Sequence, residues 1–175
     1  MTRSTLLATA AALAMSLSAA AAQSPSATAT MKGPDGAGLG TISLQELPSG
    51  MLHVFVEMTG LPPGPHGFHV HEKGECDGAG GFESAGGHYA GGHEHGSMTE
   101  AGPHAGDFPN VHVASDGVLK VEFFTDRLTL SDGDNPLMDE DGSAFVVHAD
   151  PDDYQSQPSG NAGDRIACGV VTTPS

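Results

Sequence analysis

Tryptophan is absent from this sequence, and aromatic and basic residues are scarce. Aromatic side chains make up 5% of the chain, and 6 Lys and Arg stand against 22 Asp and Glu, so the formal net charge is −16. A chain this acidic lacks the basic surface that phosphate binding requires, which argues against a nucleic-acid partner. The 25 glycines and 12 prolines exceed their usual shares and disfavour a helical bundle.

Cysteine is also rare, with 2 residues, whereas histidine is abundant, with 10. Imidazole and carboxylate without thiolate form the ligand sets of copper, zinc, iron or nickel sites. With 38% hydrophobic residues, a chain of 175 residues can bury the core of one domain. The composition therefore predicts a single domain that binds a transition metal.

Residues 1–22 are typical of a cleaved signal peptide. Arg3 precedes an uncharged apolar stretch over residues 6–17, and small residues lead up to Ala22. A retained membrane anchor is the alternative, but the stretch is rich in alanine, falls short of the ~20 strongly apolar residues that a span prefers, and has no basic cluster after it. We therefore expect residues 23–175 to form an exported, periplasmic or extracellular domain with no membrane attachment after cleavage.

The oxidising side of the membrane permits a disulfide between Cys76 and Cys168, which are the two cysteines of the chain. Two unpaired buried thiols are the alternative. A bridge between these positions would close a long loop, which is worth roughly 4–5 kcal/mol in the chain-entropy treatment.

Apolar residues in the mature chain alternate with polar ones, which is the period of a β-strand. In one such run Leu119, Val121 and Phe123 alternate with Lys120 and Glu122. Turn signals rich in Gly, Pro and Asp separate the runs, a pattern that favours an antiparallel sandwich or barrel. About eight strands are predicted, near residues 27–32, 38–47, 51–58, 66–72, 111–115, 117–125, 143–149 and 165–171, with residues 127–131 as a ninth strand or an extension.

Two long segments, residues 73–110 and 149–164, do not follow the strand period. Loops longer than about 15 residues inside a compact domain are usually functional or disordered. A flexible linker is the alternative for the glycine-rich first segment. The histidines within that segment favour a functional loop instead.

Candidate metal ligands come from both strands and loops. His69 and His71 lie two apart in a strand-like run, so the strand period directs both imidazoles to one face; the alternative is one core and one solvated histidine. Nitrogen and oxygen ligands without thiolate favour zinc or copper over an iron–sulfur cluster. Further candidates downstream are His88, His93, His95, His104, Asp107 and His148.

Several motifs in fixed order resemble the exported copper,zinc superoxide dismutases of bacteria, and the resemblance covers essentially the whole mature chain. It implies an eight-stranded antiparallel Greek-key β-barrel, related to the immunoglobulin-like sandwich, with a metal loop at about residues 73–110 and an electrostatic loop at about residues 149–164. The motifs are residues 67–72 (GFHVHE), 86–89 (GGHY), 103–107 (PHAGD), 146–148 (VVH) and 160–169 (GNAGDRIACG).

The same resemblance implies one copper ion and one zinc ion per subunit. His88 would bridge the two metals through both ring nitrogens. Copper is assigned to His69, His71, His88 and His148, and zinc to His88, His95, His104 and Asp107.

Further roles follow from the resemblance. Arg165 matches the residue that anchors the anionic substrate, and Asp152 matches the carboxylate that links a copper ligand to a zinc ligand. The family pattern also contains the Cys76–Cys168 disulfide. Both His93 and His95 could reach zinc; we expect His95, because it precedes a glycine as the zinc ligand of the family does.

The implied function is dismutation of superoxide to dioxygen and hydrogen peroxide by a copper redox cycle, with zinc as structural and tuning metal, in protection of the cell envelope. Arg165 and His88 are the expected catalytic residues. The alternatives are an exported metal buffer or copper-delivery module, a copper-only relative, and an adhesion-type sandwich with incidental histidines. The family includes monomers and dimers, so a homodimer is one expectation.

Overall fold

The computed structural model describes residues 26–174, so the signal peptide predicted over residues 1–22 lies outside the described residues. Within the described range, no helix has the length and apolar character needed to cross a membrane. A short 3₁₀ helix, η1, spans Glu83–Ala85. The strands are β1 (Ser26–Lys32), β2 (Gly38–Glu46), β3 (Leu52–Met58), β4 (Gly64–His66), β5 (Phe68–His71), β6 (Val111–Val113), β7 (Leu119–Thr125), β8 (Ala144–His148) and β9 (Arg165–Thr172).

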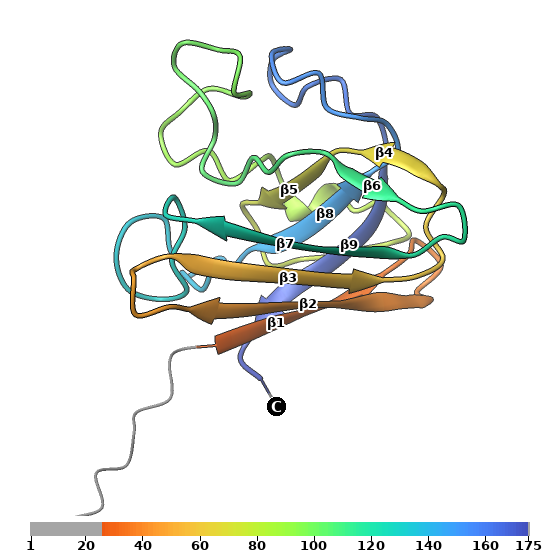
Figure 1. Cartoon of the computed structure of the whole chain (residues 1–175), viewed down its shortest axis with the longest axis horizontal. Helices are drawn as coiled ribbons and strands as arrows, with labels where there is room; N and C mark the ends of the chain where they lie inside the picture. The colour runs from red at the N-terminus through yellow and green to blue at the C-terminus, as the bar shows by residue number, and fades with distance from the viewer. Residues whose placement is uncertain (1–25, 175) are drawn as a thin grey trace, which may run out of the picture.

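The strands form a strongly curled antiparallel sheet (Figure 1). Seven of them pair in the order β5-β8-β9-β1-β2-β3-β7, while β4 and β6 form a second, two-stranded sheet. Because one residue, Gly67, separates β4 from β5, the chain itself connects the small sheet to the edge strand of the large one. The all-β fold predicted from the alternating pattern is confirmed.

Two details differ from the prediction. The strand expected over residues 66–72 is divided at Gly67, whose N–H donates to Asp150 O at 2.9 Å and whose carbonyl accepts from His148 N at 2.9 Å, so it pairs outside the regular ladder. Residues 127–131, expected as a ninth strand or an extension, form neither, since β7 ends at Thr125. Leu128 and Leu130 are buried there, but the backbone pairs only with the backbone of the nearby residues 135–138, with an isolated bridge from Thr129 to residue 136 and no regular strand.

The core fills the space inside the curled sheet. Inward side chains of β2 and β3 are buried, and those of β7 are buried or half-buried, as alternation predicts. Phe68 of β5 lies among three other rings, with centroid distances of 5.5 Å to Phe108, 5.9 Å to Phe123 and 5.5 Å to Phe145. This aromatic cluster anchors β5, the strand that carries the first two candidate ligands.

A disulfide joins Cys76 in the first long loop to Cys168 in β9, with a Cα–Cα distance of 5.8 Å, so the predicted pairing is confirmed. Phe82 and Ala85, beside and within η1, pack with Ala144 of β8 next to the bridge. Figure 1 shows the two long irregular segments together at one end of the barrel, beyond β5 and β8. The loops predicted to be functional therefore lie on the same side of the molecule.

Candidate metal centre

Strand β5 places two histidines on the face opposite its aromatic anchor. Phe68 and Val70 belong to the hydrophobic core, while His69 and His71 face the two long loops and are 0% and 1% exposed. Backbone bridges connect His69 with Asp107 and His71 with His88, so the first loop runs back along β5. Strand pairing thus gathers ligands that lie far apart in the sequence.

The first cluster consists only of histidines. The candidate ligand atoms all lie within 4.8 Å of one another. The Nε2 atoms of His71 and His148 are 3.3 Å apart, and the rings of His69 and His88 have centroids 4.0 Å apart. Its members are His69, His71, His88 and His148, all buried.

The second cluster contains three histidines around one carboxylate, and its ligand atoms also lie within 4.8 Å of one another. The Nδ1 atoms of His88, His95 and His104 lie 3.0, 3.1 and 3.3 Å from the carboxylate oxygens of Asp107. His88 belongs to both clusters, because its Nδ1 faces Asp107 while the ring lies against the first cluster. A single imidazole therefore connects the two groups.

Of the two histidines considered for the second cluster, the structure brings in His95 and leaves His93 outside. His95 is fully buried, whereas His93 is exposed on the loop surface. The N–H of the residue after His95, Gly96, donates to the Asp107 carboxylate at 2.9 Å, which fixes the loop against the cluster.

Outer contacts hold the ring nitrogens that face away from the clusters. Asp152, 4% exposed, accepts from His69 Nε2 at 2.8 Å and from His95 Nε2 at 3.0 Å. His71 Nδ1 donates to Gly86 O at 3.0 Å. Such contacts fix the tautomer and the orientation of each ring. They leave the opposite nitrogen of each ring directed into a cluster.

The electrostatics favour neutral imidazoles in the first cluster. Burial lowers the pKa of His88 to about 4 despite its hydrogen bond to Asp107. Burial likewise lowers the pKa of His148 to about 3, with His69 adding to the effect, and holds the pKa of His71 well below its usual range. At neutral pH these rings present lone pairs, which is the form that binds a metal.

Charge is concentrated in the second cluster and its support. Burial alone would raise the pKa of Asp107, but the imidazoles of His104, His88 and His95, each with Nδ1 3.0–3.3 Å from its carboxylate, hold that pKa far below its usual range. The pKa of Asp152 is also well below its usual range, because bonds from His69 and His95 outweigh its burial. Both carboxylates in turn raise the pKa of His95 to about 9 against the effect of burial.

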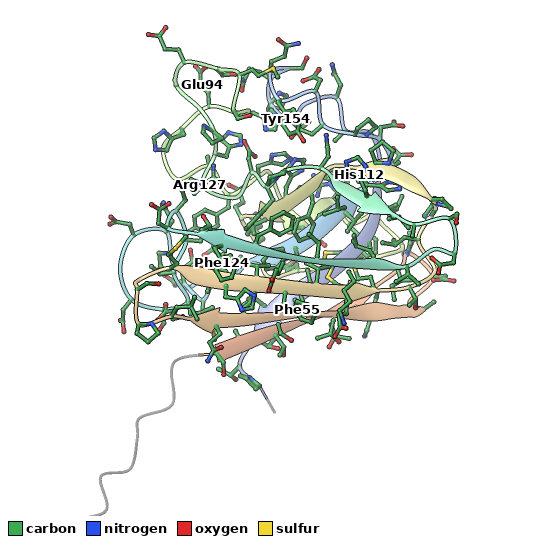
Figure 2. The ribbon with its side chains drawn as sticks, in the orientation of Figure 1. Phe55, Glu94, His112, Phe124, Arg127 and Tyr154 are labelled. Atoms are coloured by element: carbon green, nitrogen blue, oxygen red, sulfur yellow. A yellow bond between two sulfur atoms is a disulfide. The ribbon has the colours of Figure 1, made fainter. Side chains whose placement is uncertain are left out.

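Two amide side chains that the sequence analysis missed also position the centre. Gln157 Oε1 accepts from the backbone N–H of His95 at 3.0 Å, and its Nε2 donates to the His95 carbonyl at 2.8 Å. In the same way, Asn110 Oδ1 accepts from the backbone N–H of Asp152 at 2.8 Å, and Asn110 Nδ2 donates to the Asp152 carbonyl at 2.9 Å. Tyr154, labelled in Figure 2 in the second loop, accepts from Asn110 N at 2.8 Å. These contacts hold the two loops together.

Arg165 begins β9 and pairs with His148 in the sheet. Its Nη1 donates to Phe82 O at 2.7 Å and its Nη2 donates to Gly86 O at 2.8 Å. The same Gly86 carbonyl accepts from His71 Nδ1. Arg165 is thus tied to the first cluster through one shared oxygen.

The remaining histidines lie outside the clusters. His66 is buried between the carbonyls of Pro62 and His148, at 2.8 Å from each. His53 contacts Glu122 and stacks on Phe124, on the outer face of β3 and β7, where Figure 2 labels Phe124. None of these contacts belongs to the metal-ligand groups found among residues 26–174.

The sequence model of the copper/zinc superoxide dismutase family matches residues 39–171. The chain belongs to this family. It is 44% identical over 140 residues to superoxide dismutase [Cu-Zn] 2 of Aquifex aeolicus, covering 78% of this chain and 81% of that protein. It is 42% identical over 145 residues to superoxide dismutase [Cu-Zn] of Caulobacter vibrioides, covering 81% and 82%. The crystal structure of a SOD-like protein from Bacillus subtilis superimposes with a TM-score of 0.79 at 38% identity, covering 83% of this chain and 97% of that one.

The donor sets of this family member fit copper and zinc. Four imidazoles without a carboxylate suit copper, while three imidazoles and one carboxylate suit tetrahedral zinc. Buried polar atoms normally have a partner. In the described part of the chain, the buried side-chain atoms without a hydrogen-bond partner are His69 Nδ1, His88 Nε2, His95 Nδ1 and His104 Nδ1. All four belong to the two clusters, so a copper and a zinc ion would satisfy each of them.

Proposed function

We propose that this protein dismutates superoxide to dioxygen and hydrogen peroxide. The observation that carries the proposal is the pair of buried clusters joined by His88. When bound, copper supplies reversible one-electron chemistry and zinc supplies structure and electrostatic tuning. The proposed copper ligands are His69, His71, His88 and His148, and the proposed zinc ligands are His88, His95, His104 and Asp107.

His88 is the proposed proton carrier. Its Nδ1 is held 3.0 Å from Asp107, so the ring keeps its orientation while Nε2 gains or loses a proton. Nε2 is buried, has no hydrogen-bond partner within residues 26–174, and lies on the side of the ring that faces the first cluster. We propose that Nε2 takes up and delivers a proton needed to form hydrogen peroxide.

Arg165 is the proposed binding group for the superoxide anion. A guanidinium has five N–H donors, and the carbonyls of Phe82 and Gly86 use two of them. The others remain for an anion beside the first cluster, where a fixed positive charge acts in a partly buried setting. Only 14% of the Arg165 side chain is exposed, so its position is well defined.

We further propose that the protein is exported, with residues 1–22 removed and residues 23–175 as the mature domain. A disulfide between Cys76 and Cys168 supports this, because such bonds persist in oxidising compartments. In the periplasm the enzyme would protect the cell envelope from superoxide. Homodimer formation remains a prediction, which sedimentation of the mature protein would test.

Metal analysis combined with direct measurement of superoxide decay tests the function. We expect about one copper and one zinc per chain and a large acceleration of decay. Equal metal contents without acceleration would refute the enzyme and favour the metal buffer. Arg165→Ile should slow decay with both metals retained, whereas His95→Ala should lose zinc and its matched control His93→Ala should not.

A further inference from the structure

Within residues 26–174 a single carboxylate lies at ion-pair distance from Arg165. Glu83 Oε2 is 3.6 Å from Arg165 Nη2. The two side chains differ sharply in exposure, because 79% of Glu83 but only 14% of Arg165 is accessible to solvent. No hydrogen bond joins these two groups, since Arg165 donates to the carbonyls of Phe82 and Gly86 instead. The Glu83 carboxylate is thus an exposed negative charge close to the guanidinium.

The backbone around Glu83 is firmly held although its side chain is exposed. Glu83 is the first residue of η1, and the preceding Phe82 is buried and adopts a left-handed conformation with φ of 62°. Phe82 N donates to Asp77 O at 2.8 Å, and Phe82 O receives the bond from Arg165. The disulfide at Cys76 ties the same segment to β9. The backbone therefore keeps Glu83 beside the guanidinium, although its side chain is exposed.

We propose that Glu83 determines which anions reach Arg165, an inference that rests on the proposed anion-binding role of Arg165. Its carboxylate opposes any anion that approaches the guanidinium. The opposing energy scales with the charge of the incoming anion. Glu83 therefore discriminates against divalent anions such as phosphate more strongly than against monovalent superoxide. It also weakens part of the attraction between Arg165 and superoxide.

The expected effects follow from this charge scaling. In a water-rich setting, a unit charge about 6 Å from a monovalent anion changes its affinity about threefold, and it changes the affinity of a divalent anion by the square of that factor, about ninefold. Glu83→Gln should therefore bind azide about threefold more tightly and divalent phosphate about ninefold more tightly. It should also raise the rate constant for superoxide decay about threefold at low ionic strength, with a smaller gain in high salt.

The experiment uses the copper- and zinc-loaded full-length mature protein at pH 8, where phosphate is mainly divalent. Azide and phosphate are titrated at one fixed ionic strength with the visible spectrum of bound copper as readout, and superoxide decay is measured separately. Asp116→Asn is the matched control, because it removes one exposed charge from the turn before β7, outside both long loops. Glu83→Asp keeps the charge and should resemble the parent.

Three outcomes would overturn the inference. Glu83→Gln could behave like Asp116→Asn in all measurements, it could affect azide and phosphate equally, or it could slow decay, which would mean that Glu83 positions Arg165. If the parent protein itself fails to accelerate superoxide decay, the proposed function is wrong, while the two anion titrations still decide the role of Glu83. Metal content of each variant shows that the fold and centre are intact.

Discussion

The side-chain amide of Gln157 provides a sharp test of how the second loop supports the proposed zinc ligand His95. Replacement by alanine removes two hydrogen bonds, at 3.0 and 2.8 Å, to the backbone of His95. A bond of this kind contributes about 0.5–1.5 kcal/mol, so the pair contributes about 2 kcal/mol. The His95 carbonyl keeps its bond from the Thr99 hydroxyl at 2.8 Å, which limits the loss.

Without these contacts, zinc binding itself must order the backbone of His95. The cost of about 2 kcal/mol corresponds to a zinc dissociation constant raised about 30-fold. The assay is competition for zinc between the protein and a chromophoric chelator, with copper content measured in parallel. We expect copper to be retained, because the Gln157 amide contacts no residue of the first cluster.

Gln155→Ala is the matched control, since this exposed glutamine lies two residues away in the same loop. Equal zinc affinity in Gln157→Ala, Gln155→Ala and the parent would refute the reasoning, because the backbone of His95 would then need no support from the second loop. Equal weakening in both variants would point to a general loosening of the loop instead.

Four further predictions concern the disulfide, proton release on zinc binding, stability in acid, and salt. Replacing Cys76 and Cys168 together by serine should lower the free energy of unfolding by about 4–5 kcal/mol, because the disulfide spans 92 positions. Urea denaturation measures this change, and a loss below about 1 kcal/mol would contradict the prediction. Zinc uptake by metal-free protein at pH 7.5 should release at least one proton, because the pKa of His95 is about 9; calorimetry in buffers of different ionisation enthalpy counts the protons. The metal-free fold should also lose stability as the pH falls from about 6.5 towards 3. The folded-state pKa values of His88, about 4, and His148, about 3, lie below the unfolded value, so the unfolded chain binds protons first. Thermal unfolding measures this, and an unfolding temperature that does not change across this pH range would contradict it. Finally, with a net charge of −16, added salt should raise the rate of superoxide decay or leave it nearly unchanged, and a steep fall would show that a local positive surface dominates.

Much of the barrel could be predicted from the sequence because one face of most strands is buried. The alternation around Val121 marks the face of β7 that packs against the core, where Val121 itself is half-buried. The same signal misled at Leu128 and Leu130, whose side chains are buried without sheet pairing. Alternation records which side chains meet the core, whereas pairing depends on the neighbouring backbone.

The candidate centre was predictable where its ligands stand in short motifs, as with His69 and His71. The supports of Gln157 and Asn110 were not, because each amide binds backbone atoms 62 or 42 positions away. Backbone groups are the same at every residue, so no spacing or residue type signals their partner. Only the meeting of two loops in space defines these contacts.

The carbonyl oxygen of Gly86 has a consequence for protein engineering. One oxygen accepts from both His71 and Arg165, and Gly86 holds it there with φ of 75°, a conformation that favours glycine. A library that randomises residues 82–87 therefore cannot tune anion affinity and metal retention as separate traits. Selection for one trait will carry the other with it, and improved variants should be sought outside this segment.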